Sequence, residues 1–321
     1  GDHRDLHLSL RRQRQMCIRD SLEHPEDTIL TGDLSVLDWF KAEGQMSVKI
    51  DGAPAIVWGK DPATGTFFVG TKSVFNKKKI KINHSHEEIE QNHEGEVASI
   101  LHDCFDCLPR IDGIVQGDFI GYGGDDTYTP NAITYVFLEI IKESIIVAPH
   151  TYYTADKDLR DAVAHPLKGW DMVMTLGDTK DVKFVMPDAW ERVDEEFDVH
   201  TICEFARQMS QMCQYASVSE VAKIKKVINT FVKINAVLDP EALATAAECD
   251  VNLMRLWKLV HTIKMEMLSL CDDNGPDAWM GKRYSYCGEG YVRSNQHGTY
   301  KLVDRLQFSR FNFNHGKMSR R

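Results

Sequence analysis

The spacing of the apolar residues changes near position 200, and this change limits the possible folds more than any other feature of the chain. From 200 to 272, apolar residues recur every three or four positions, as on one face of a helix. Before that region, turns separate short β-rich runs at residues 46–50, 55–59, 66–70, 113–120 and 132–140, the last extending to 147. Strands followed by a block of helices favour an α+β fold with antiparallel sheets over a doubly wound fold, in which strands and helices alternate.

Turn and capping residues mark several boundaries in the first part of the chain. The stretch 60–65 holds a proline and a glycine between two β-rich runs, which predicts a hairpin. A short helix is expected to begin after Asp33, a suitable N-cap, and to end at Gly44. A second helix is expected from Ser85, because Glu88 gives the spacing of a capping box, and it should run past residue 101.

The helical block divides the chain into predicted parts. Pro240 suits the first turn of a helix, so we expect three or four helices packed together. Strand-like runs return at 290–293 and 299–303. The expected parts are a core of residues 22–199 and 275–321 and a helical subdomain or insertion of residues 200–274.

Residues 1–21 do not fit this scheme. They hold five arginines among polar residues and show neither helical nor strand periodicity. We interpret them as a disordered tail or as translated sequencing-adapter read-through, with a basic arm for nucleic acid as the alternative. They are therefore excluded from the fold prediction.

The charge balance excludes a protein coated with basic surface. The 321 residues hold 38 Lys and Arg against 48 Asp and Glu, a formal net charge of -10 at pH 7. This argues against a histone-like nucleic-acid binder but leaves room for a local basic groove. No apolar run reaches the roughly 18 residues that a membrane span requires, so we expect no membrane partner.

The eight cysteines are scattered, and Cys104 and Cys107 form the one CxxC pair. Because the chain shows no signal-peptide pattern, we expect reduced thiols and a cytoplasmic protein. A structural zinc site would need a second ligand pair. We therefore expect buried cysteines on a helix, with zinc as the alternative.

Several short segments carry residue types suited to nucleotide chemistry. In chain order they are Val48-Lys49-Ile50-Asp51-Gly52, Gly70-Thr71-Lys72-Ser73, Gly117-Asp118-Phe119-Ile120-Gly121, Phe137-Leu138-Glu139, Glu289-Gly290-Tyr291-Val292-Arg293, and Lys301. Each alone is most simply a surface residue in a strand or turn. A functional interpretation therefore depends on the order of the whole set.

In this order the segments resemble the motifs of the covalent nucleotidyltransferase superfamily, which includes ATP-dependent DNA and RNA ligases and mRNA capping enzymes. The RNA-ligase-like branch is the most similar, and the resemblance spans residues 46–303, interrupted by the helical block. It implies a nucleotidyltransferase core of ATP-grasp-like antiparallel sheets. The activity that it implies is that of an ATP-dependent polynucleotide ligase working through a lysyl-AMP intermediate. RNA is favoured over DNA as the substrate.

The resemblance assigns roles by motif. Lys49 and Lys301 match catalytic lysines, and Lys49 is the one that becomes linked to the nucleotide. The implied nucleotide-binding residues are Val48, Lys72, Asp118, Phe137 and Glu289. Asp118 and Glu289 are also the implied ligands of Mg²⁺ or Mn²⁺, since hard divalent ions take oxygen ligands. Phe137 is expected to stack on adenine, and Lys72 to reach the ribose or the acceptor 5′-phosphate.

The chain departs from the family pattern at three places. Asp118 stands where a glutamate is usual, which shortens the reach by one methylene. Val303 stands where a second lysine is common, and Arg305 is a candidate substitute. The helical block lengthens the spacing before Glu289. The chain also leaves no room after Lys301 for an OB-fold domain, which favours an RNA-ligase-like or minimal ligase.

The implied chemistry accounts for the residue types. The Lys49 amine must attack the α-phosphorus of ATP, although an unperturbed lysine has a pKa of about 10.4 and is charged at pH 7. A bound divalent ion and the cation Lys301 favour the neutral amine. The nucleotide then passes to a 5′-phosphate end, and a 3′-hydroxyl attacks to seal the strand.

The expected partner is nucleic acid with 5′-phosphate and 3′-hydroxyl ends. In an acidic chain, the basic run that holds Lys77, Lys78, Lys79 and Lys81 is the best candidate for contacts with its phosphates. Two alternatives stay open: a GTP-dependent capping-type guanylyltransferase, and a catalytically weak nucleic-acid-binding module. The sequence leaves the oligomeric state open.

Overall fold

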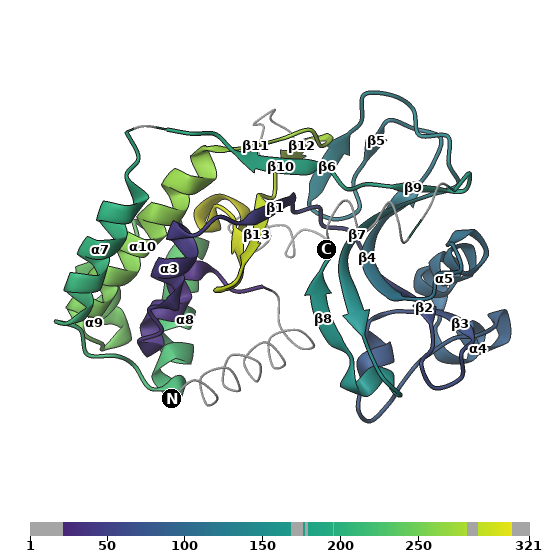
Figure 1. The fold of residues 1–321 in the computed structure, drawn as a ribbon, viewed down its shortest axis with the longest axis horizontal. Helices are drawn as coiled ribbons and strands as arrows, with labels where there is room; N and C mark the ends of the chain where they lie inside the picture. Colours follow the sequence, from purple (N-terminus) through teal and green to yellow (C-terminus); the bar gives the residue numbers. More distant parts are fainter. Residues whose placement is uncertain (1–21, 168–175, 177–178, 195, 281–287, 310–321) are drawn as a thin grey trace. The chain divides into compact units, whose positions relative to one another are not determined.

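The computed structural model describes residues 22–167, 176, 179–194, 196–280 and 288–309. The chain forms two compact units, both coloured by sequence in Figure 1. Unit 1 comprises residues 50–187 and 275–286, and unit 2 comprises residues 22–49, 188–274 and 287–321. Residues 1–21, interpreted above as a tail or an artefact, lie outside the described residues.

Unit 1 contains two sheets. Their strands are β2 (Ala55–Lys60), β3 (Phe67–Gly70), β4 (Ile114–Tyr122), β5 (Thr127–Tyr128), β6 (Ile133–Val136), β7 (Ile145–Thr154), β8 (Val163–Pro166), β9 (Val182–Phe184) and β12 (Asp277–Met280). The larger sheet has the order β3-β2-β4-β7-β8, with β9 parallel to β7, and the smaller has the order β12-β6-β5. The antiparallel β2–β3 pair confirms the predicted hairpin.

The two faces of the larger sheet carry different clusters. On one face, α4 (His86–Asn92) and α5 (Gly95–Cys107) pack with Val115 and Phe119 of β4. On the other, Ile114 packs with Tyr153 of β7 and with residues around the short 3-10 helix η2 (Lys72–Phe75). Because side chains alternate along a strand, Asp118 lies on the same side of β4 as Ile114.

Two predicted elements of unit 1 differ from the structure. The helix expected from Ser85 past residue 101 is two helices, because the backbone at His93 and Glu94 is extended. The strand expected at 132–147 is broken between β6 and β7. There Phe137 donates its backbone N–H to the carbonyl of Asp126, which extends the β5–β6 pairing by one step before the chain leaves the sheet.

Unit 2 holds one five-stranded antiparallel sheet and most of the helices. The strands are β1 (Gln45–Val48), β10 (Asp188–Glu191), β11 (Cys271–Asp273), β13 (Tyr291–Asn295) and β14 (Gly298–Leu302), in the order β11-β10-β1-β13-β14. The helices are α2 (Pro25–Thr28), η1 (Ile29–Thr31), α3 (Ser35–Lys41), α7 (Val199–Ser210), α8 (Val218–Lys233), α9 (Pro240–Ala247), α10 (Val251–Ser269) and the π-helix η4 (Arg305–Ser309). The two units together confirm the α+β class.

The helical block forms as its capping residues predict. Asp239 caps α9, with Pro240 in the first turn. Ser217 and Glu220 form a capping box at the start of α8, which satisfies two backbone N–H groups that the helix itself cannot. Four helices, α7 to α10, therefore occupy the region where three or four were expected.

The observed units divide the chain differently from the expected core and helical subdomain. The helical block lies in unit 2 with residues 22–49 and 287–321. The reason is a shared apolar core: Trp39 of α3, Trp257 of α10 and Leu302 of β14 are all fully buried in one cluster. Burial of large apolar side chains, worth about 1.5–3 kcal/mol each, joins these segments into one unit.

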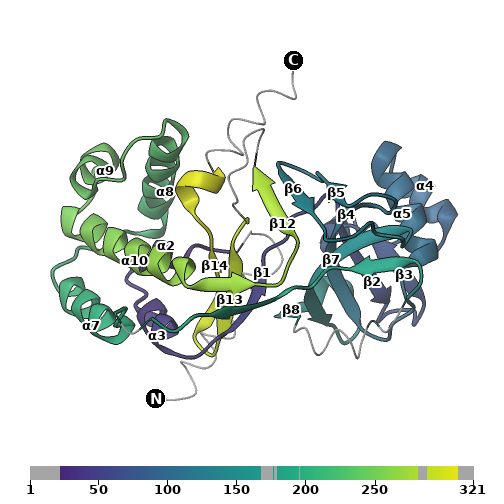
Figure 2. The ribbon, with the colours of Figure 1, turned by 90° about the horizontal axis from the view of Figure 1, so that it is seen from above.

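The two faces of the unit 2 sheet differ in character. Met46, Arg293 and Tyr300 are in register across β1, β13 and β14, and all three contact the helical side of the unit. The next row, Val292 and Lys301 with Ser47, points to the opposite face. Figure 2 shows these three strands side by side, near α2 and α10. Among the described residues, no helix has the length and apolar content that crossing a membrane requires.

Candidate active site

Lys49 and Glu289 form an ion pair in unit 2. Lys49 directly follows β1, and Glu289 precedes β13, so the pairing of these two strands brings the residues together. Glu289 is buried, with 3% of its surface exposed, whereas the Lys49 side chain is 24% exposed. The lysine side chain is therefore partly exposed while its counter-charge is held in the interior.

Gly290 fixes the geometry between these two residues. Its carbonyl accepts the backbone N–H of Lys49 at 2.8 Å, which extends the β1–β13 pairing by one step. Gly290 has a φ of +115°, and a Cβ there would lie 2.2 Å from the carbonyl oxygen of Leu302. A glycine is therefore required beside Glu289 for β13 to pair with β14.

Lys301 of β14 lies on the open face of the same sheet. Its register partner is Val292 of β13, in the row that faces away from the helices. Burial, together with the positive charges of Lys49 and Arg305, lowers its pKa to about 8. Lys49, Glu289 and Lys301, which come from three separate motifs, therefore lie together in unit 2.

Two arginines of the motif segments have structural contacts. Arg293 pairs with Glu191 at 2.6 Å and donates to the carbonyls of Trp39 and Ala42 on the helical face. Arg305, considered above as a substitute for the second family lysine, is buried and makes a two-pronged pair with Asp27. Arg305 is thus engaged in the interior of unit 2.

Val48 lies on the other face of the sheet from Lys49. It is the last residue of β1 and is in register with Tyr291, which packs against the helical core. Successive residues of a strand point to opposite faces. Its contribution to the site is therefore through the backbone that leads into Lys49.

The Asp51-Gly52 turn is held inside unit 1. The hydroxyl of Tyr135 accepts the backbone N–H of Asp51 at 2.8 Å, and Asn131 donates to the Asp51 carboxylate at 2.8 Å. A Cβ on Gly52 would lie 2.2 Å from the carbonyl oxygen of Phe119. Close packing against β4 therefore accounts for the glycine of the lysine motif.

Asp118 lies on β4 in a small polar cluster. It accepts the backbone N–H of Gly52 at 3.4 Å, and its carboxylate is 3.8 Å from Nε2 of His150. His150 is the extra residue where the β4–β7 register shifts, and it also contacts Gln116 at 3.3 Å. Bulges of this kind redirect a side chain. The spacing of residues in the sequence does not indicate that His150 would lie beside Asp118.

The other predicted nucleotide contacts also lie in unit 1. Lys72 begins η2 and is exposed. Phe137 is half-buried, and its ring packs edge-to-face on Tyr128 with centroids 5.8 Å apart. Neither residue contacts the Asp118 cluster through a described hydrogen bond or ring contact.

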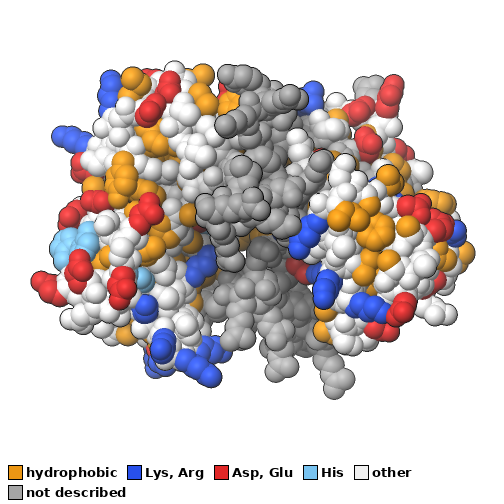
Figure 3. Space-filling view, turned by 180° about the vertical axis from the view of Figure 1, so that it is seen from behind, with side chains coloured by type: hydrophobic (Ala, Val, Ile, Leu, Met, Phe, Trp, Pro, Cys, Tyr) orange, Lys and Arg blue, Asp and Glu red, His pale blue; other side chains and the backbone are white. Residues whose placement is uncertain are grey.

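The basic run of unit 1 is mostly solvated. Lys77, Lys78 and Lys79 are exposed, whereas Lys81 is half-buried and donates to the carbonyl of Asn92. On the face drawn in Figure 3, Lys and Arg side chains gather in small groups among acidic and uncharged ones. Basic and acidic side chains are thus interspersed on this face, as the net charge of -10 leads one to expect.

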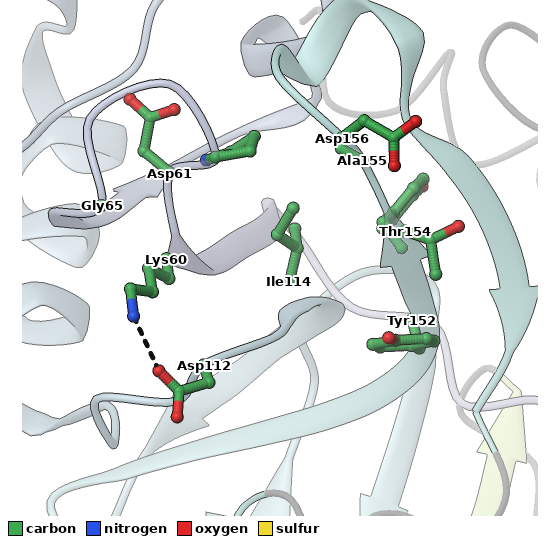
Figure 4. Close-up of a pocket in the computed structure, with 11 residues that line it drawn as sticks. Lys60, Asp61, Gly65, Asp112, Ile114, Tyr152, Thr154, Ala155 and Asp156 are labelled. Carbon is green, nitrogen blue, oxygen red and sulfur yellow. Dashed lines mark hydrogen bonds and ion pairs between the residues drawn. The ribbon is translucent and has the colours of Figure 1, made fainter.

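A pocket of about 480 Å³ opens elsewhere in unit 1 (Figure 4). It is lined by three aspartates, Asp61, Asp112 and Asp156, with Lys60 paired to Asp112 at 3.0 Å. None of the residues predicted for nucleotide chemistry lines it. Its acidic lining repels phosphates, so this pocket is not the candidate site.

Comparison with known proteins identifies a family but no activity. The chain matches a family described as a family of unknown function (DUF6267) over residues 20–250 and 241–317. It belongs to this family. No curated protein matches the chain, and no solved structure matches it. The two matched segments include all three residues brought together in unit 2, Lys49, Glu289 and Lys301.

The described residues offer few protein ligands for a metal ion. Among the residues that the structure describes, no group of three or more His, Cys, Asp or Glu side chains is arranged to hold a metal ion. Mg²⁺ keeps several waters and takes one or two carboxylates together with substrate phosphates. Glu289, which is buried and pairs with Lys49, is the one carboxylate among the three residues that meet in unit 2.

The CxxC pair has a packing role. Cys104 is fully buried in α5, and burial raises the pKa of its thiol well above the ordinary value. Cys107 is the last residue of α5 and is half-buried. This confirms the expectation of buried cysteines on a helix for Cys104.

The sequence missed a buried ion network in unit 2. Glu26 pairs with Lys264 at 2.8 Å, with both side chains fully buried, and Asp27 pairs with Arg305. His261 lies in the same region, stacked on Trp257. The partners are more than 200 positions apart in the chain, with separations of 238 and 278 residues, so no local pattern marks them.

Proposed function

We propose that this protein is an ATP-dependent polynucleotide ligase, acting more on RNA than on DNA, with a nucleotidyltransferase core. The observation that carries the proposal is the meeting of Lys49, Glu289 and Lys301 in unit 2. Three segments spread over the chain supply the nucleophile, the carboxylate and the second cation that this chemistry needs. A purely structural role would not require a second lysine close enough for the charge of Lys49 to lower its pKa.

In the first step, the lone pair of Lys49 Nζ attacks the α-phosphorus of ATP. A P–N bond forms, the bond to the bridging oxygen breaks, pyrophosphate leaves, and the amine loses its proton. Lys301, as a cation close to Lys49, repels the ammonium form of that amine and stabilises the negative charge that spreads over the phosphoryl group. Lys49 becomes competent when Glu289 no longer holds its ammonium form.

Glu289 is the residue through which a bound metal ion would affect the nucleophile Lys49. Its buried carboxylate would hold Mg²⁺ or Mn²⁺, an ion that supplies charge stabilisation to the phosphates when it is bound. A carboxylate engaged in this way attracts the Lys49 proton less. The chain would then couple metal and nucleotide binding to release of the lysine from its ion pair.

Two further steps complete the reaction. An oxygen of a 5′-phosphate end attacks the α-phosphorus, the P–N bond breaks, and AMP moves to that end through a pyrophosphate linkage. A 3′-hydroxyl then attacks the 5′-phosphate, a phosphodiester forms, and AMP leaves. The exposed lysines Lys77 to Lys79 are the proposed phosphate contacts, so binding should weaken as salt is raised.

The location proposed for the protein is the cytoplasm. Six cysteines within the described residues are free thiols. Free thiols persist where glutathione and thioredoxin keep cysteines reduced.

Incubation with α-labelled nucleotide and Mg²⁺ or Mn²⁺ tests the proposal. Label from ATP that becomes attached to the protein, and that is lost in Lys49→Ala, supports the ligase. Label from GTP alone would replace the proposal with a capping-type guanylyltransferase. A folded protein that takes label from neither nucleotide would leave only a nucleic-acid-binding module.

A further inference from the structure

Asp27 anchors the segment that follows Lys301. Arg305 donates from its two terminal nitrogens to the two carboxylate oxygens of Asp27, at 2.9 and 2.7 Å. Both side chains are buried, and Trp257 of α10 donates to the same carboxylate at 3.1 Å. A two-pronged pair of this kind fixes the orientation of the guanidinium as well as its position.

Residues 23–27, here called the strap, also hold Lys301 directly. The backbone N–H of Lys301 donates to the carbonyl of Glu23 at 3.2 Å. The strap is itself tied down, because Glu26 pairs with Lys264 of α10 and Glu23 pairs with Lys225 of α8. The strap therefore contacts the backbone of Lys301 directly. It also holds the residues that follow Lys301 in place through the pair between Asp27 and Arg305.

We infer that Asp27 is a positioning residue for Lys301 and acts through Arg305. The catalytic use of Lys301 rests on the proposed function, whereas the contacts described above do not depend on it. Asp27 and the strap keep Lys301 half-buried on the open face of the sheet, close to Lys49, and prevent its side chain from extending into water.

The charges that face Lys301 come from three elements, and the titratable His24 of the strap faces it as well. Lys49 follows β1, Arg305 follows β14, and Glu26 and Asp27 belong to α2. Burial is the largest cause of the lowered pKa of Lys301, the two cations add to it, and the two carboxylates oppose it. Release of the segment after β14 would hydrate Lys301, and its pKa would rise toward the ordinary lysine value.

Competitive acylation of the full chain with acetic anhydride over a range of pH tests this inference. Mass spectrometry follows modification of Lys301, with exposed Lys226 as the reference in the same sample. We expect a midpoint near pH 8 in the unaltered protein. In Asp27→Asn the midpoint should rise by about one pH unit or more, because loss of burial outweighs loss of one negative charge.

Two further variants sharpen the result. Arg305→Lys keeps the charge but loses the two-pronged geometry, so its midpoint should also rise. Asp38→Asn is the matched control, because Asp38 pairs with Arg207 between α3 and α7 in the same unit, and its midpoint should stay near the unaltered value. A midpoint that stays unchanged in folded Asp27→Asn and Arg305→Lys would overturn the inference.

Hydrogen exchange of the unaltered protein covers the case in which neither variant folds. We expect the Lys301 amide and the strap amides to exchange at matching rates, since they open together. Exchange at Lys301 that is much faster than in the strap would contradict the positioning role. The acylation and exchange measurements use no nucleotide, so their outcome is separate from whether Lys49 accepts AMP.

Discussion

Lys49 and Glu289 are 240 residues apart in the chain, and they form an ion pair whose carboxylate is 3% exposed. The pairing of β1 with β13 holds them in contact, and the N–H of Lys49 donates to Gly290 at 2.8 Å. A lysine in this state is a cation and does not act as a nucleophile. Chemistry at Lys49 therefore depends on what competes for Glu289, and this dependence can be tested.

Replacing Glu289 should separate catalysis from folding. In Glu289→Gln the amide no longer offers a charged ligand, so labelling of the protein by ATP should fall by about 100-fold. The matched control is Glu191→Gln, which removes an ion pair to Arg293 on the opposite face of the same sheet. The control should lower the melting temperature while labelling per folded molecule is retained. Equal losses of labelling in both variants would count against a site role for Glu289.

The charge of Lys301 should limit the labelling rate at high pH. Its pKa of about 8 means that Lys301 is a cation below that pH and loses its charge above it. The rate of lysyl-nucleotide formation should therefore decline above about pH 8 in the unaltered protein. Lys301→Arg stays charged throughout, so the decline should disappear or move to higher pH. A decline at the same pH in both proteins would assign it to another group.

Gly290→Ala should destabilise unit 2 strongly. A Cβ would lie 2.2 Å from a backbone oxygen of β14 at a φ of +115°, so β13 and β14 would have to separate. We expect a loss of about 3 kcal/mol in the free energy of unfolding. Gly95→Ala is the control: its φ is +62°, but a Cβ there meets nothing within 4 Å, so about 1 kcal/mol is expected. Denaturant unfolding measures both, and equal losses would show that the close contact does not matter.

Buried His261 should make the protein sensitive to acid. Burial lowers its pKa to about 2, from 6.5, with help from Lys264 and Lys258. In the unfolded chain His261 binds a proton near pH 6.5, whereas in the native protein it stays neutral. The free energy of unfolding therefore decreases as the pH falls below about 6.5. Between pH 7 and 5 this amounts to about 2 kcal/mol.

His261→Phe keeps an aromatic ring next to Trp257 and removes the titrating group. Thermal unfolding at pH 7 and at pH 5 should show a smaller loss in this variant than in the unaltered protein. His297→Phe replaces an exposed histidine of unit 2 and should leave the loss unchanged. The same pH dependence in all three proteins would assign the acid sensitivity to other groups.

Local signals in the sequence predict most of the secondary structure. Capping residues such as Ser85 and Asp239 mark helix starts, and the turn at 60–65 marks the hairpin. Each of these signals depends only on residues that are close together in the chain, so the sequence alone is enough to detect it. The sequence does not predict the break at His93, because Ile89, Val97, Ile100 and Leu101 lie near helical spacing across it.

The grouping of segments into units could not be predicted in the same way. Residues 22–49 join the helical block because Trp39 and Trp257 share a core, and that contact spans most of the chain. The motif order did predict that Lys49, Glu289 and Lys301 meet. It did not predict Asp27 or His150, since their partners are distant in the chain and neither residue belongs to a motif.

Locating the nucleotide on the protein tests the central claim most directly. The full chain is incubated with ATP and Mg²⁺ or Mn²⁺, digested at neutral pH, and the peptides are sequenced by mass spectrometry. We expect the mass of one AMP on Lys49, and no adduct in Lys49→Ala that remains folded. An adduct on Lys301 or on another residue, or no adduct on the folded unaltered protein, would contradict the account.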